Sequence, residues 1–186
     1  FINQLSNICQ NIPGTNIDDV AKIIGLDPRI GKLFLNAGPG YGGSCLPKDI
    51  SALINFADKI GVNPLLLNAV KKTNHEQVNN IVSLMKKILG NIAAKRITVL
   101  GTAFKPNTDD IRESTSLIIA RELLNKSAKI KVYDPKAMKN VKKEMGELEF
   151  CKNAYEACQR SKGLIIATEW NEFKALDLIK VKSLME

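Results

Sequence analysis

Apolar residues recur at helical spacing through the first ninety positions. Such a pattern over residues 1–11 ends at Pro13, which predicts a first short helix. A second helix is expected over residues 16–24, where Asn16 can serve as the N-cap. A third is expected over residues 46–60, before a Gly-Val-Asn-Pro break. This part of the chain is therefore predicted to be all-α.

A long uninterrupted helix is predicted from Pro64 to about Leu89. Its apolar positions are Leu67, Val70, Val78, Ile81, Val82, Met85 and Leu89. A helix this long exceeds the globular mean and is typical of a domain connector or a dimer seam. The alternative is that the apolar stripe packs on residues 1–60 of the same chain.

Short apolar runs alternate with helical patterns after Lys95. Strands are expected over 96–101, 129–134, 149–151 and 163–168, with helices over 114–125, 137–145 and 153–160 between them. This alternation indicates βαβ units and a parallel sheet. The predicted fold is α/β. An all-α central dimerisation region (1–90) with a long connecting helix precedes a Rossmann-like domain (91–186).

Charge and composition narrow the classes of function. Lys and Arg outnumber Asp and Glu by 27 to 19, which favours anionic partners. The basic residues are scattered and aromatic residues make up 5% of the chain, which speaks against nucleic-acid binding. No apolar run approaches the about 20 residues that cross a bilayer, so no membrane partner is expected. The first residues have neither a signal-peptide pattern nor an initiator Met, and we expect a piece of a longer protein.

The four cysteines, Cys9, Cys45, Cys151 and Cys158, form no CxxC pair. A single histidine, His75, further speaks against a metal site. Without secretion signals, a reducing cytoplasmic compartment is expected, and disulfides are not. A functional cysteine here would act as a thiolate.

Residues 36–44 form a glycine-rich loop whose backbone can approach a ligand closely. Residues 38–43 satisfy the G-x-G-x-x-G pattern, but a dinucleotide fingerprint requires a preceding strand. Here the flanks are helical, and Pro39 removes an amide that would face a pyrophosphate. The glycines therefore predict a tight loop and no dinucleotide site.

Cys45 follows this loop at the predicted start of a helix. Free backbone amides and the helix dipole there favour a thiolate, and Lys48 adds positive charge. Asp49, about one turn later, could orient a water or take a proton. The alternative is a small apolar residue buried at a helix start.

The motifs around these residues resemble the UDP-glucose dehydrogenase family. Residues 26–31, 34–38 and 42–49 are similar to its active-site signature. Residues 101–114, 133–135 and 168–170 resemble its UDP-binding domain. The resemblance covers essentially the whole chain, and mannuronate-forming relatives usually differ around the cysteine.

The resemblance implies an NAD-dependent oxidation of UDP-glucose to UDP-glucuronate in two steps. Cys45 would attack the C6 aldehyde to give a thiohemiacetal, which is oxidised to a thioester, and Asp49 would assist its hydrolysis. Lys48 and Arg112 would approach NAD. The nucleotide sugar would be held by Phe34, Leu35, Asn36, Ala37, Gly38, Gly42, Phe104 and Lys105, with Arg29 reaching it from a partner subunit.

The same resemblance implies that the N-terminal NAD-binding domain lies outside this chain, which alone should not transfer hydride. A homodimer or higher homo-oligomer is expected. The rival interpretations are a non-catalytic nucleotide-sugar-binding or dimerisation module, a dehydrogenase of a related UDP-sugar, and a nucleic-acid binder. Asp134 ends a strand where dinucleotide sites carry a ribose acid, so NAD binding there is a weaker alternative to UDP. The role of Trp170, core or interface, stays open.

Overall fold

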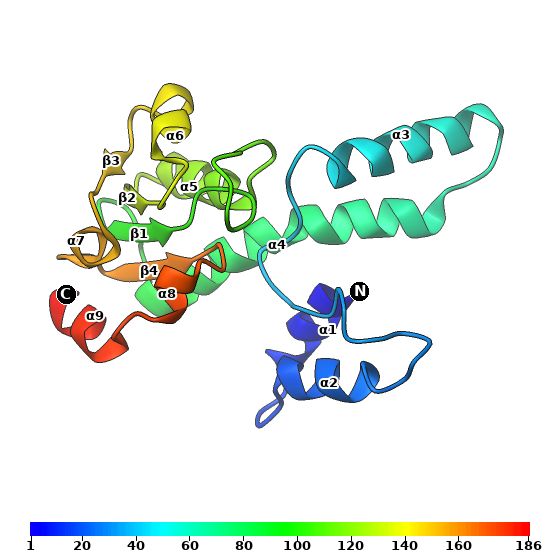
Figure 1. Cartoon of the computed structure of the whole chain (residues 1–186), viewed down its shortest axis with the longest axis horizontal. Coiled ribbons are helices and arrows are strands. Elements are labelled where there is room, and N and C mark those ends of the chain that lie inside the picture. The colour runs from blue at the N-terminus through cyan, green and yellow to red at the C-terminus, as the bar shows by residue number, and fades with distance from the viewer.

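A computed structural model describes residues 1–186. The first half is helical and consists of α1 (Ile2–Cys9), α2 (Ile17–Ile24), α3 (Leu46–Lys59) and α4 (Leu65–Leu89). Figure 1 shows α3 running alongside the first half of α4, with α1 and α2 on the other side of the long helix. No helix, α4 included, is both long enough and apolar enough to span a bilayer.

Local chemistry sets the ends of these helices. The Asn16 side chain accepts a 3.0 Å hydrogen bond from the Asp18 amide, which caps α2 as the sequence predicted. Pro47 lies in the first turn of α3, where its missing N–H is harmless. Gly61 follows α3 with a φ of +74°, a conformation that glycine adopts without strain.

The second half is a four-stranded parallel sheet covered by helices. Its strands are β1 (Arg96–Leu100), β2 (Lys129–Tyr133), β3 (Glu149–Phe150) and β4 (Gly163–Ile166), in the order β3-β2-β1-β4. The helices are α5 (Thr115–Asn125), α6 (Met138–Glu144), α7 (Ala154–Cys158), α8 (Asn171–Lys174) and α9 (Leu178–Leu184). The predicted α/β fold and parallel sheet are confirmed.

The last two helices were not predicted. Both are at most seven residues long, too short to show a helical period in the sequence. Asp177 caps α9 by accepting hydrogen bonds from the amides of Ile179 and Lys180. Trp170, directly before α8, is buried in the core, which decides the alternative that the sequence left open.

The hydrophobic core lies in the sheet domain and includes the second half of α4. Val78, Val82 and Met85 join the cluster formed by the strands and by α5. The start of β4 lies so close that a side-chain carbon on Gly163 would come within 2.7 Å of the Met85 sulfur. This part of the expected dimer seam is thus buried within the chain itself, on the sheet domain instead of on residues 1–60.

The helical half buries little of its own apolar surface. Before Val78, its buried apolar side chains are Ile2, Leu35, Ile54, Ala57 and Pro64. The hairpin of α3 and α4 instead exposes Leu53, Phe56, Ile60, Val62, Leu65 and Leu66, the last two at 72% and 77%. One group of exposed apolar side chains therefore lies toward the end of the hairpin that is remote from the sheet (Figure 1).

Replacing Met85 with alanine should test whether α4 belongs to the core of the sheet domain. Loss of a buried Met side chain is expected to lower the free energy of unfolding by about 2–5 kcal/mol in urea titration. Ile88, on the same helix but 68% exposed, is the matched control. Ile88→Ala should change stability by about 0.5 kcal/mol or less. Equal small effects for both variants would contradict the packing described above.

Candidate active site

The glycine loop is attached to three separate parts of the molecule. The Gly38 amide donates a 2.9 Å hydrogen bond to Oδ1 of Asn3 on α1. The Tyr41 amide and carbonyl both bond to the side chain of Asn74 on α4. The Gly43 amide donates a 2.9 Å hydrogen bond to the Arg112 carbonyl, in the loop between β1 and α5. The loop therefore joins the helical half to the sheet domain.

The glycines of this loop fit closely against protein. A side-chain carbon on Gly40 would lie 2.7 Å from Oδ1 of Asn74, and one on Gly43 would lie 2.6 Å from the Phe104 ring. A carbon on Gly42 would collide with the Glu113 carbonyl. The close approach that the sequence predicted is therefore made, at these three positions, to other parts of the chain.

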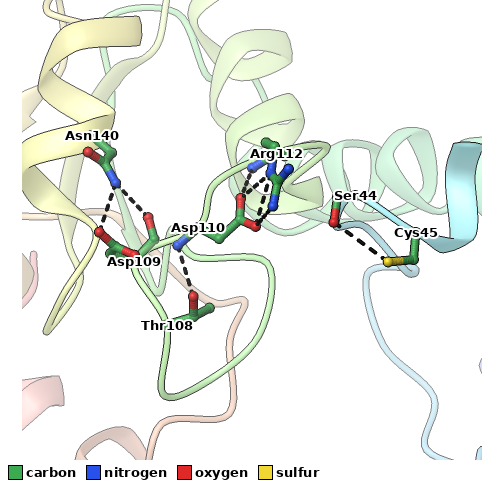
Figure 2. A network of polar contacts seen from close by, with 7 residues as sticks. All are labelled: Ser44, Cys45, Thr108, Asp109, Asp110, Arg112 and Asn140. Carbon is green, nitrogen blue, oxygen red and sulfur yellow. Dashed lines mark hydrogen bonds and ion pairs between the residues drawn. The ribbon is translucent and has the colours of Figure 1, made fainter.

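Cys45 lies at the N-cap position of α3 and is exposed. Its Sγ is 3.7 Å from the Ser44 hydroxyl oxygen (Figure 2). The Lys48 Nζ lies 3.3 Å from a carboxylate oxygen of Asp49, and both side chains are exposed. The positive charge of Lys48 is thus partly balanced by the carboxylate of Asp49.

Arg112 supplies a second cation near the thiol. Its guanidinium forms a bidentate pair with the Asp110 carboxylate, with a closest N···O distance of 2.6 Å (Figure 2). These hydrogen bonds raise the pKa of Arg112 and lower that of Asp110, and the charge of the Cys45 thiolate also raises the pKa of Arg112. The loop between β1 and α5 therefore places the guanidinium of Arg112, paired with Asp110, on the side of Cys45 (Figure 2).

Other polar contacts hold this loop in place. The Asp110 amide donates to the Thr108 hydroxyl at 3.1 Å. Asn140 of α6 donates a 2.9 Å hydrogen bond to the Asp109 carbonyl, as Figure 2 shows. The position of Arg112 thus depends on a helix of the sheet domain.

One cavity of about 690 Å³ lies between the glycine loop and the ends of the strands. We name it the Phe104 cavity. Of the residues expected to hold a nucleotide sugar, it is lined by Phe34, Asn36, Ala37, Gly38, Phe104 and Lys105. The Lys105 ammonium lies 5.4 Å from the Phe104 ring centre, within cation–π range. Two segments about 70 positions apart in the sequence thus line one cavity.

A second cavity, of about 750 Å³, lies between α3, α4 and the start of α5. We name it the Arg112 cavity. Four basic side chains line it: Lys48, Lys71, His75 and Arg112. Glu113 is the single acidic residue on its wall. Its charge suits an anionic ligand.

Three residues line both cavities: Tyr41, Asn74 and Thr115. The sequence analysis assigned no role to any of them, nor to Lys71. Asn74 carries no local signature, since it is one polar residue among many on a long helix. Its place at the site depends on the tertiary structure alone.

The remaining expected site residues lie outside the two linings. Leu35 is buried, although Phe34 next to it in sequence is exposed. Arg29 is exposed and forms a bidentate pair with Asp27. Cys45 and Asp49 lie beside the Arg112 cavity, next to its lining residues Ser44 and Lys48, and Gly42 packs against the β1–α5 loop.

Asp134 is a buried carboxylate at the end of β2. Its Oδ2 accepts hydrogen bonds from the amides of Thr102 and Ala103 and from the Trp170 indole, at 2.7–3.2 Å. Its Oδ1 accepts from the amides of Lys136 and Ala137. The group is therefore occupied within the fold, and the position offers no free acid to a ribose.

The other thiols have different surroundings. Cys151 and Cys158 are buried, and desolvation raises the pKa of both, that of Cys151 to about 11. Cys9 is half-buried. Cys45 is the exposed thiol and the one beside a cavity with cationic walls.

Comparison with known proteins agrees with this architecture. The central-domain model of the UDP-glucose/GDP-mannose dehydrogenase family matches residues 1–76, and the family's UDP-binding-domain model matches residues 98–186. UDP-glucose 6-dehydrogenases of Rickettsia conorii and Rhizobium meliloti are 42% and 41% identical over the whole chain. The chain spans 44% and 43% of their lengths.

Solved structures give the same result. The UDP-glucose dehydrogenase of Pyrobaculum islandicum superimposes with a TM-score of 0.92 at 36% identity, covering 95% of this chain and 41% of that one. A UDP-D-ManNAc dehydrogenase from Pyrococcus horikoshii shares the fold, with a TM-score of 0.83 at 22% identity over 100% of this chain and 41% of that one. From the two matched regions, their order and this identity, the chain belongs to the UDP-glucose/GDP-mannose dehydrogenase family.

Proposed function

We propose that this chain forms the sugar-nucleotide and thiol half of an NAD-dependent UDP-glucose 6-dehydrogenase, which converts UDP-glucose to UDP-glucuronate. The observation that carries the proposal is the Phe104 cavity. Residues that the family resemblance singled out in two distant segments line this one space, next to the loop that ends at Cys45. The names of the relatives support UDP-glucose over other nucleotide sugars.

In this proposal the two walls of the cavity bind different parts of the ligand. Phe104 offers an aromatic face to the uracil, and Lys105 offers a point charge to the diphosphate. Backbone groups from Phe34 to Gly38 hold the sugar, with Leu35 anchoring that segment in the interior. Gly42 acts through the close packing of the loop on Glu113.

Cys45 acts as the nucleophile. Its thiolate adds to the C6 aldehyde. A C–S bond forms, the π electrons of the carbonyl move to its oxygen, and the oxygen takes up a proton to become a hydroxyl. Loss of the C6 hydride, together with the hydroxyl proton, from the resulting thiohemiacetal leaves a thioester. Water then attacks the thioester carbon, assisted by Asp49, and the C–S bond breaks to release the carboxylate and the thiol. Arg112 stabilises the thiolate at the first stage.

The residues of the Arg112 cavity fit an anionic dinucleotide. Lys48 and Arg112, with Lys71 on the opposite wall, can face a pyrophosphate. NAD, when bound, accepts the hydride in each of the two oxidations. The buried Asp134 speaks against a second dinucleotide site on the sheet. Because these residues form only one side of an NAD site, we expect no turnover by the 186-residue chain alone.

We further propose a homodimer in which the exposed apolar hairpin of α3 and α4 is paired. Its seam differs from the stripe that the periodicity suggested, because Val78, Val82 and Met85 are already buried in the chain. Arg29, exposed and outside both cavity linings, then reaches the neighbouring subunit's sugar.

Binding of UDP should depend on Lys105. Isothermal titration of the chain with UDP is expected to show affinity about 10–100-fold lower for Lys105→Ala, since a charge-assisted phosphate contact is lost. Lys139→Ala removes an exposed lysine on α6, outside the cavity, and should leave the affinity unchanged. Equal loss in both variants would indicate non-specific attraction to a basic protein and would refute the proposed site.

Alkylation should single out Cys45. With iodoacetamide at neutral pH, Cys45 is expected to react first, because it is exposed and lies near cations. Cys151 and Cys158 should react only after unfolding, since burial shields both sulfur atoms and raises the pKa of both thiols. Peptide mapping by mass spectrometry gives the order. Labelling of another cysteine before Cys45 in folded protein would count against its role.

Assembly should depend on the far end of the hairpin. Light scattering is expected to show a dimer that Leu66→Asp dissociates, since a charge would be buried at the seam. Ile179→Asp alters an equally exposed apolar residue on α9 and should leave the dimer intact. A monomeric parent chain, or a dimer that survives Leu66→Asp, would overturn the proposed seam.

A further inference from the structure

The side chain of Asn74 forms a two-point clamp on the backbone of Tyr41. Its Oδ1 accepts a 2.8 Å hydrogen bond from the Tyr41 amide, and its Nδ2 donates a 2.9 Å hydrogen bond to the Tyr41 carbonyl. The orientation of the side-chain amide follows from its partners, because each atom faces a group of the opposite kind. No other side chain of similar size offers both a donor and an acceptor in this arrangement.

Tyr41 lies where the glycine loop passes from one cavity to the other. Residues 38–41 line the Phe104 cavity, while Tyr41, Gly43 and Ser44 line the Arg112 cavity. Asn74 borders both cavities as well. The clamp therefore lies where the proposed sugar site adjoins the cavity beside Cys45.

The loop and the clamp are fitted to one another. Gly40 has a φ of +107°, and any side-chain carbon there would lie 2.7 Å from Oδ1 of Asn74. The absence of a side chain thus lets the amide reach Tyr41. Since α4 is fixed in the core of the sheet domain a few residues later, at Val78, Asn74 holds the loop from a rigid support.

We propose that Asn74 is a positioning residue. By fixing the glycine loop where the two cavities adjoin, it holds the sugar-facing backbone in a defined position relative to Cys45. The inference rests on the proposed function. Phe104 and Lys105 need no help from the clamp, since their loop is held within the sheet domain, where the Phe104 amide donates to the Asp110 carbonyl. Loss of the clamp should therefore affect the sugar end of the ligand and spare the uridine diphosphate end.

The test combines UDP binding with protection of Cys45 from alkylation by saturating UDP-glucose. In the wild-type chain, UDP-glucose is expected to slow the labelling of Cys45 at least about tenfold by seating its sugar at the thiol. Asn74→Ala should reduce this protection to less than about twofold, because two hydrogen bonds that fix the loop are lost. Its affinity for UDP, measured by calorimetry, should stay within about twofold of the wild-type value.

Two further variants sharpen the test. Asn74→Asp keeps the size and one acceptor but sets a carboxylate oxygen against the Tyr41 carbonyl, so it should lose protection as Asn74→Ala does. Asn79→Ala makes the same change at an exposed position of α4 and should behave as wild type.

Each outcome separates one explanation from another. Full protection in Asn74→Ala would overturn the positioning role. Loss of UDP binding together with early labelling of Cys151 and Cys158 would show that Asn74 maintains the fold as a whole, and would also overturn it. A wild-type chain that binds UDP but gains no protection from UDP-glucose would refute the proposed placement of the sugar at Cys45, and the inference with it.

Discussion

The burial of the second half of α4 in the sheet domain is the constraint on which the rest of the site depends. A helix of 25 residues is about 37 Å long, and its two ends cannot move independently. With Val82 and Met85 enclosed by the strands and α5, the direction of the first half is determined. The hairpin with α3, and Cys45 at its start, therefore take their positions from the sheet.

The same constraint explains why a glycine-rich loop can be well placed. Glycine lowers the cost of unusual backbone conformations but adds freedom in the unfolded chain. Attachment to Asn3, Asn74 and the Arg112 carbonyl offsets this freedom at three points between Gly38 and Gly43. The position of the thiol that follows the loop thus depends on contacts with α1, with α4 and with the β1–α5 loop that bears Arg112.

Sequence reasoning predicted most of the architecture, because its signals were local. Asn16 as a cap, the glycine and proline breaks, and the alternation after Lys95 all act within a few residues. The position of Cys45 at a helix start followed from the same kind of signal. The apolar stripe of α4 was equally visible, but periodicity shows which face is buried and not what covers it. Only the structure identifies the covering element, because it shows the sheet domain packed against Val78 and Met85.

Parts of the site carry no local signal at all. Asn74 is recognisable as a clamp only when the loop, 33 positions earlier, is brought beside it. The short helices α8 and α9 have too few turns to produce a pattern, and Trp170 gave no indication of its partner. Each of these depends on contacts between distant segments, and the residue pattern along a single sequence does not reveal such contacts.

Asp134 has a consequence for how this sheet domain treats ligands. In dinucleotide-binding domains of this topology, the amides after the first strand face a phosphate, and the acid after the second strand faces a sugar hydroxyl. Here the acid turns back onto those amides, at Thr102 and Ala103, and a buried indole closes the arrangement. The side chain of Asp134 thus occupies the position at which a domain of this topology would otherwise bind a phosphate. A nucleotide bound in the Phe104 cavity, as we propose, would lie outside this arrangement and leave the hydrogen bonds of Asp134 intact.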